Sequence, residues 1–135
     1  MVALTSHSIV PRVLGQRLSA EPGVVCAYLF GSHARGDAGA DSDLDLAVLT
    51  VDAVGDDLLN PLVRLQMDLE DATGCSVDLI DLHRAGADLI HRVLRDGLLV
   101  FESDPERRIA FEVDARNRYF DLLPYLEEYR RAGNT

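Results

Sequence analysis

Asp43 and Asp45 are the residues of this chain whose type and spacing most directly indicate chemistry. They flank Leu44 at the start of an apolar run that is typical of a strand, and alternate residues of a strand point to the same face. Two carboxylates on one face repel each other, so a divalent cation between them would explain their placement. Magnesium is favoured because it prefers carboxylate oxygens and substrate phosphates to a complete protein cage.

Gly31 and Ser32 precede this pair by ten residues and have the features of an anion site. Glycine lets a phosphate approach the backbone, and the first amides of a helix point at a bound anion. Ser32 adds a hydroxyl donor. Together with the two acids, this turn predicts in-line attack on a nucleotide phosphate, with two metal ions stabilising the attacking and leaving oxygens.

Arg35 lies in the same turn and has two interpretations. It can reach a phosphate as a fixed cation, or it can form a salt bridge with Asp37 or Asp41. The sequence leaves both open. His33 is expected to be an exposed turn residue and not a base.

Helices and strands alternate along the chain and must position these residues. Periodic apolar positions predict helices over 8–20, 58–72 and around 89–94, the last ending at Gly97. Apolar runs predict strands over 24–30, 44–50, 75–82 and 98–101, the last at an edge. Asp104, Pro105 and Glu106 predict the start of a final helix to about Leu123, which Pro124 is expected to kink or break. The fold class is therefore α/β (α+β), with a small mixed β-sheet flanked by helices, a domain over 1–123 and a helical tail over 124–135.

Composition excludes several classes of protein. A chain of 135 residues suits one domain, and its net charge of −10 argues against direct nucleic-acid binding, which needs a basic face. The charge suits an enzyme whose carboxylates hold cations, or a partner for a basic protein. Without a leader segment or an apolar run of about 20 residues, we expect a cytoplasmic protein with no membrane contact. Cys26 and Cys75 are expected to be small core hydrophobes and not a disulfide.

The spacing of these residues resembles a known signature. Gly31-Ser32, ten residues and Asp43-Leu44-Asp45 is similar to the signature of the polymerase-beta-like nucleotidyltransferase superfamily, which implies that fold. The closest resemblance is to minimal nucleotidyltransferases of the MntA-type antitoxin subgroup, which are encoded with HEPN-domain toxins. The segments that carry it are Phe30-Gly31-Ser32-His33-Ala34-Arg35-Gly36, Ser42-Asp43-Leu44-Asp45-Leu46 and the tail Asn117-Arg118-Tyr119-Phe120-Asp121-Leu122-Leu123-Pro124. The resemblance implies that the chain transfers AMP from ATP, with Mg²⁺, to a tyrosine of its HEPN toxin and so silences an RNase.

The superfamily also uses a third carboxylate on a neighbouring strand. Asp78 and Asp81 are three residues apart, so they face opposite sides of a strand and only one can join the site. The family pattern apolar-Asp-apolar-apolar matches Val77-Asp78-Leu79-Ile80, so the resemblance implies that Asp78 binds metal and accepts the proton of the attacking hydroxyl. Asp81 is expected to be a solvated or capping acid. The predicted catalytic and metal-binding residues are Asp43, Asp45 and Asp78, and the predicted phosphate-binding residues are Gly31, Ser32 and Arg35.

Two alternatives remain beside this enzyme. One is an antitoxin that neutralises its toxin by binding alone, and the other is a nucleotidyltransferase for a small-molecule hydroxyl. Three acids favour catalysis, and the absence of a second domain disfavours a small-molecule pocket. In the tail, we expect Phe120 and Leu123 to pack on the domain, and we expect the aromatic residues and arginines beyond Pro124 to form a toxin-binding surface.

Overall fold

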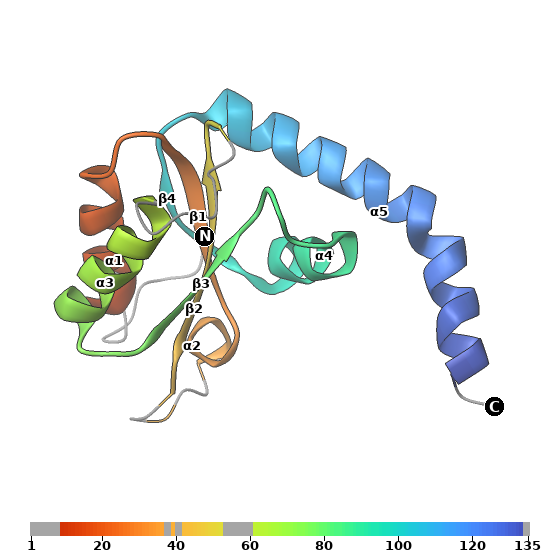
Figure 1. The fold of residues 1–135 in the computed structure, drawn as a ribbon, viewed down its shortest axis with the longest axis horizontal. Coiled ribbons are helices and arrows are strands. Elements are labelled where there is room, and N and C mark those ends of the chain that lie inside the picture. The colour runs from red at the N-terminus through yellow and green to blue at the C-terminus, as the bar shows by residue number, and fades with distance from the viewer. Residues whose placement is uncertain (1–8, 37–38, 40–41, 53–60, 134–135) are drawn as a thin grey trace.

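The computed structural model describes residues 9–36, 39, 42–52 and 61–133, which form a four-stranded sheet with helices on both faces (Figure 1). The strands are β1 (Val24–Phe30), β2 (Leu44–Thr50), β3 (Val77–Asp81) and β4 (Leu98–Glu102). Their order is β3-β2-β1-β4. β1 is antiparallel to β2 and β4, whereas β2 and β3 are parallel. The predicted mixed sheet is confirmed, and β4 lies at an edge as expected.

The helices are α1 (Ile9–Ser19), α2 (Ser32–Arg35), α3 (Pro61–Thr73), α4 (Ala87–Asp96) and α5 (Pro105–Gly133). All of them were predicted, although the first residues expected for α1 and α3, Ser8 and Leu58, lie outside the described residues. The third strand is shorter than predicted. Cys75 belongs to the turn after α3, where its amide donates to Thr73 Oγ1 at 3.2 Å.

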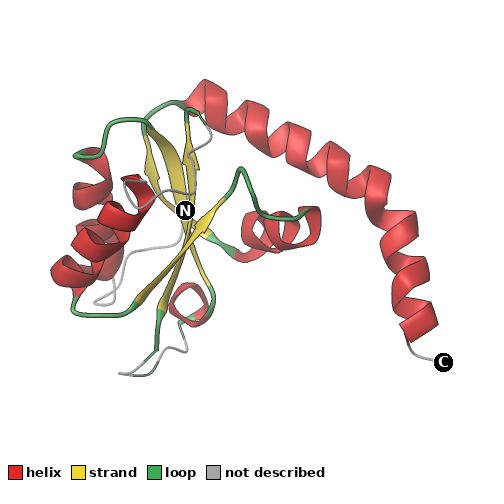
Figure 2. Ribbon diagram, viewed as in Figure 1, coloured by secondary structure: helices red, strands yellow, loops and turns green. Residues whose placement is uncertain are grey.

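The sheet separates two hydrophobic cores. One face packs against α1 and α3, and the other packs against α4 and the first half of α5. Figure 2 shows the strands between these two groups of helices. Alternation along β2 illustrates the division, because Leu44 and Leu46 enter the first core and Ala47 and Leu49 enter the second. Burial on both faces explains why the strands read as continuous apolar runs.

The first half of α5 is fixed to the sheet by polar contacts. Asp104 caps the start of the helix, and its Oδ1 accepts from the amide of Arg107 at 3.1 Å. The Tyr28 hydroxyl on β1 donates to Glu112 Oε1 at 2.6 Å. Arg108 joins the same carboxylate at 3.0 Å and also binds Glu102 of β4. These contacts hold the start of α5 against β1 and β4.

The second half of α5 leaves the sheet but still contacts α4, where the Tyr119 ring stacks on His91 at 3.7 Å and Arg130 donates to Asp88 Oδ1 at 3.1 Å. The break considered at Pro124 does not occur, since the helix runs on to Gly133. Figure 1 shows the dark blue end turning away from the direction of the first half, as expected for a proline that removes one helical hydrogen bond. The expected packing of Phe120 is wrong, because its side chain is 63% exposed, while Leu123 is half-buried. Tyr125 and Tyr129 are exposed, as predicted.

Both cysteines are free thiols, with Cys26 buried and Cys75 half-buried, so the predicted absence of a disulfide holds. Burial raises the pKa of the Cys26 thiol to about 11, which keeps it neutral. Among the helices of the described segments, none combines the length and the apolar character that a membrane span requires.

Candidate active site

Asp45 and Asp78 lie side by side on the two parallel strands. They are register partners in the pairing of β2 with β3. Their neighbours Leu44, Leu46 and Val77 enter the core under α1 and α3, so both carboxylates lie on the opposite face, which α4 covers. Asp43 directly precedes β2 and has the same parity. The structure therefore brings the three predicted acids to one face of the sheet.

The second acid of β3 lies elsewhere. Ile80 and Leu82 enter the α4 core, which directs Asp81 between them to the α1 and α3 face. Its Oδ1 accepts from the amide of His83 at 2.9 Å, and its Oδ2 lies 4.0 Å from Arg84 Nε. Asp81 thus caps the turn after β3 and is separated from the other acids by the sheet.

The electrostatics of Asp45 show that the acids interact. Its pKa is raised above the ordinary value, first by burial and then by the negative charges of Asp78 and Asp43. The positive charges of His33 and Arg35 oppose this rise to a smaller extent. A cation placed among the acids would relieve this repulsion.

These acids fit a metal that is bound together with substrate. Across the described stretches of the chain, no three His, Cys, Asp or Glu side chains converge closely enough to hold a metal ion by themselves. A Mg²⁺ ion bound by one or two carboxylates and completed by phosphate oxygens needs no such group. Asp43 and Asp45 would be those two carboxylates, with Asp78 beside them.

Gly31 shapes the other side of the site. Its φ of 74° and ψ of −152° lie in a region that is essentially restricted to glycine. A Cβ built on it would overlap Oδ2 of Asp45 and approach its Cγ to 3.2 Å. Glycine is therefore required twice, for the backbone conformation and for the space that the carboxylate occupies.

The helix that follows presents its first amides beside this contact. The carbonyl of Gly31 accepts from the amides of Ala34 and Arg35, both at 3.1 Å. The amides of Ser32 and His33 precede these first helical bonds, so they belong to the donors that a helix start leaves for an anion. A phosphate held there would lie next to the Asp45 carboxylate.

His33 has a role that the sequence did not reveal. It is half-buried, contrary to the expectation of an exposed turn residue, and its Nε2 lies 3.2 Å from the carbonyl oxygen of Ser42. Because a carbonyl only accepts, Nε2 carries the proton in this contact. His33 therefore ties α2 to the segment that leads into Asp43. No motif signalled it, since its partner is a backbone atom.

A cleft opens next to Gly31, on the same face of the sheet as the acids. It has a volume of about 220 Å³ and is lined by Phe30, Gly31, Arg35, Leu89, Arg92 and Asp96. Arg35 lines this cleft. Its alternative partners, Asp37 and Asp41, lie outside the described residues, so its role at a phosphate stays a prediction. Sequence reasoning missed Arg92 and Asp96, because their place depends on how α4 packs.

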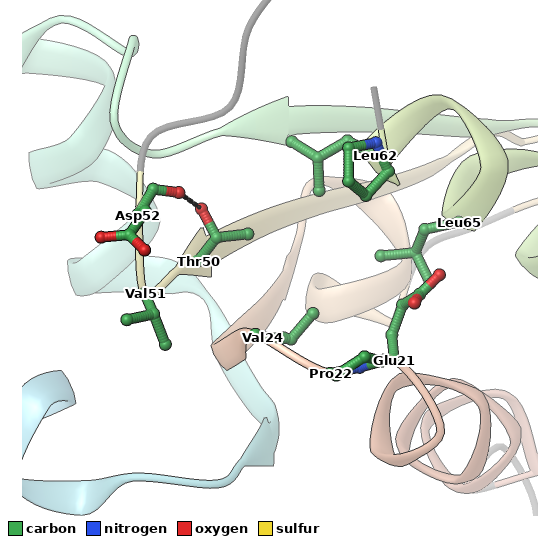
Figure 3. Close-up of a pocket in the computed structure, with 10 residues that line it drawn as sticks. Glu21, Pro22, Val24, Thr50, Val51, Asp52, Leu62 and Leu65 are labelled. Atoms are coloured by element: carbon green, nitrogen blue, oxygen red, sulfur yellow. Dashed lines mark hydrogen bonds between the residues drawn. The ribbon is translucent and has the colours of Figure 1, made fainter. Parts of the chain in front are cut away.

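A second cavity, of about 160 Å³, lies at the other end of β2 (Figure 3). Val24, Leu62 and Leu65 line it, and at its rim Thr50 Oγ1 donates to the carbonyl of Asp52 at 2.6 Å. Thr50 and Asp45 are at opposite ends of the same strand, so this cavity is remote from the acids.

The fold and the acid pair define a class of protein. The sequence profile of the family "Polymerase beta, Nucleotidyltransferase" matches residues 14–106, which include all the acids above. The chain belongs to this family, and the predicted superfamily is confirmed.

The relatives are more specific. The protein adenylyltransferase MntA of Shewanella oneidensis strain MR-1 is 36% identical over 78 residues, which are 56% of this chain; the chain spans about half (52%) of that relative. A toxin–antitoxin structure with AMP-PNP has a TM-score of 0.78 and 25% identity, covering 94% of this chain and 99% of the other. A structure of the tri-AMPylated S. oneidensis HEPN toxin with its MNT antitoxin has a TM-score of 0.75 at 23% identity, covering 96% and 99%, and shows the fold. The predicted likeness to MntA-type proteins is confirmed.

Proposed function

We propose that this chain is an antitoxin that transfers AMP from ATP to a tyrosine of a HEPN-domain toxin and thereby neutralises it. The observation that carries the proposal is the contact of Gly31 with the Asp45 carboxylate, with Asp78 in register beside it. This contact sets the turn that we propose to bind phosphate directly against a pair of acids. The similarity to a protein named an adenylyltransferase supports transfer of AMP in particular.

The proposed step assigns a role to each residue. The tyrosine oxygen forms a bond to the α-phosphorus of ATP, and the bond from that phosphorus to the α–β bridging oxygen breaks. Pyrophosphate leaves with the electron pair, and the tyrosine proton passes to Asp78. The amides and hydroxyl at Ser32 hold the phosphates. Magnesium, held by Asp43 and Asp45, would supply charge neutralisation at the phosphates.

The acceptor is the part of the proposal that depends most on resemblance. The matched complex with AMP-PNP is a toxin–antitoxin pair, and the exposed second half of α5 offers this chain a surface for such a partner. Tyr125 and Tyr129 are 70% and 79% exposed. Exposed aromatic side chains are typical anchors of protein interfaces.

The test is intact-mass measurement of a cognate HEPN protein after incubation with this chain, ATP and Mg²⁺. We expect a mass increase of one or more AMP units, loss of RNase activity, and neither effect with Asp43→Asn/Asp45→Asn. Asp81→Asn is the matched control, since it removes one carboxylate on the other face of the sheet. An RNase silenced equally by the double variant, with no mass change, would show that binding alone neutralises the toxin and would refute the enzyme.

A further inference from the structure

The cleft beside Gly31 is built from two elements that are distant in sequence. Phe30, Gly31 and Arg35 come from the end of β1 and from α2, and Leu89, Arg92 and Asp96 come from α4. Phe30 and Leu89 also pack against the core under α4, which gives the cleft an apolar floor. Two guanidinium groups, one from each element, line its walls. In a chain of net charge −10, this is a local site for an anion.

The acid in the cleft is paired mainly with an arginine that does not line it. Asp96 forms a bidentate pair with Arg95, with distances of 2.9 Å to Nε and 2.8 Å to Nη2. The pKa of the Asp96 carboxyl is lowered first by this hydrogen bonding and, to a smaller extent, by the charge of Arg35. Arg35 therefore lies within electrostatic reach of α4, and the negative charge of Asp96 is already engaged.

The strand order gives the site a direction. Across the sheet the acids and the turn follow one another as Asp78 on β3, Asp45 on β2 and Gly31 at the end of β1. Register pairs Asp45 with Asp78 on one side and with Phe30 on the other. Arg92 lines the cleft together with Phe30 and Gly31, so it lies near the β1 end of this row and not at Asp78.

In-line phosphoryl transfer requires the attacking and leaving oxygens to lie on opposite sides of the reacting phosphorus. If Asp78 receives the proton of the attacking hydroxyl, the leaving group departs toward β1 and the cleft. From this juxtaposition we propose that Arg92, which lines the cleft together with Arg35, binds the β- and γ-phosphates of ATP and the pyrophosphate that leaves. This rests on the proposed nucleotidyl transfer and adds a residue that the motif does not contain.

The chemistry of the leaving group suits two guanidinium groups. When the bond from the α-phosphorus to the bridging oxygen breaks, that oxygen takes the electron pair and pyrophosphate gains negative charge. Guanidinium binds phosphate oxygens through two parallel N–H donors and stays charged at every working pH. Arg92 is exposed, so its removal leaves the core intact.

The experiment measures binding directly, without toxin. Wild-type protein, Arg92→Ala and Arg64→Ala are titrated calorimetrically with magnesium pyrophosphate, with ATP and with AMP. Arg64 is the matched control, because it is an exposed arginine of α3 on the other face of the sheet. We expect Arg92→Ala to weaken pyrophosphate and ATP by about 10- to 100-fold, the range of a lost charge-assisted hydrogen bond. AMP lacks the β- and γ-phosphates, so its affinity for Arg92→Ala is expected to stay within about two-fold of that for the wild type.

The outcomes separate this inference from the proposed function. Equal pyrophosphate affinity in wild type and Arg92→Ala, with ATP still bound, would overturn the role of Arg92 and leave nucleotidyl transfer standing. An equal loss for AMP and pyrophosphate would overturn the assignment to the leaving group. Wild-type protein that binds neither ATP nor pyrophosphate would overturn both proposals. A loss with Arg64→Ala as large as with Arg92→Ala would reduce the effect to net charge and refute the site.

Discussion

Replacing Gly31 by alanine is expected to destabilise the domain, because the added methyl group strains the backbone and crowds the Asp45 carboxylate. The backbone there lies in a glycine-only region, which costs about 1 to 3 kcal/mol for other residues. The added Cβ also overlaps the Asp45 carboxylate, and forcing an atom into occupied space costs about 1 to 3 kcal/mol. The sum, about 4 kcal/mol, corresponds to a fall in Tm on the order of 15 °C for a domain of this size.

Gly36→Ala provides the matched control. Gly36 also has a positive φ, 82°, yet nothing lies within 4 Å of its ideal Cβ, so only the left-handed backbone contributes, about 1 kcal/mol. Chemical denaturation of the wild type, both variants, Asp45→Ala and Gly31→Ala/Asp45→Ala measures each contribution. We expect Gly31→Ala to cost about half as much stability in the Asp45→Ala background as in the wild type. The difference is the coupling energy between these two contacting residues. Equal losses at the two glycines, or no coupling to Asp45, would refute the steric argument.

Three further predictions concern the acids and the tail. The raised pKa of Asp45 means that its negative charge destabilises the fold above that pKa. Asp45→Asn should therefore raise Tm at pH 7 in EDTA, and this gain in Tm should disappear as the pH falls toward 4. An equal gain at both pH values would contradict the prediction. Asp78→Asn should lower the rate of AMP transfer at least about 100-fold. Asp81→Asn should leave that rate nearly unchanged, because its amide oxygen still accepts from the His83 amide on the other face of the sheet; equal rates for the two variants would refute the assignment. Truncation after Leu123 removes the exposed aromatic residues, so pull-down of the toxin should weaken. Tm should change little, because the Arg130–Asp88 ion pair that is also lost is exposed and contributes under about 1 kcal/mol.

Local patterns determined how well each element could be predicted. The strands Val24–Phe30 and Leu44–Thr50 were predicted with their observed bounds, because continuous burial on both faces leaves an uninterrupted apolar run. Cys75 was misplaced because a turn bond to a threonine hydroxyl has no apolar signature. Phe120 was expected to pack on the domain as part of an amphipathic terminal helix, and its exposure follows from the direction in which α5 leaves the sheet.

The site divides in the same way. Gly31, Ser32, Asp43 and Asp45 lie close together in sequence, so their spacing alone was enough to predict them as site residues. The family match covers the same segment. Arg92 could not be found, because its position beside Gly31 depends on β4 pairing with β1 rather than with β3. That choice is made by the packing of two cores and not by any local pattern.

The unfavourable charge of the site has a functional consequence. A chain of net charge −10 repels free ATP, and the acids around Asp45 repel one another. Binding of ATP without a cation is therefore unfavourable at this site. Under the proposed function, a divalent cation bound with ATP would neutralise the acids and the phosphates together, and the arginines of the cleft would bind the end of the triphosphate that remains charged. Binding therefore relieves a repulsion present in the unliganded fold, and any ligand that binds only the folded state stabilises it. The proposed function therefore predicts that stability and nucleotide binding are coupled at Asp45, where Gly31 leaves room for the carboxylate.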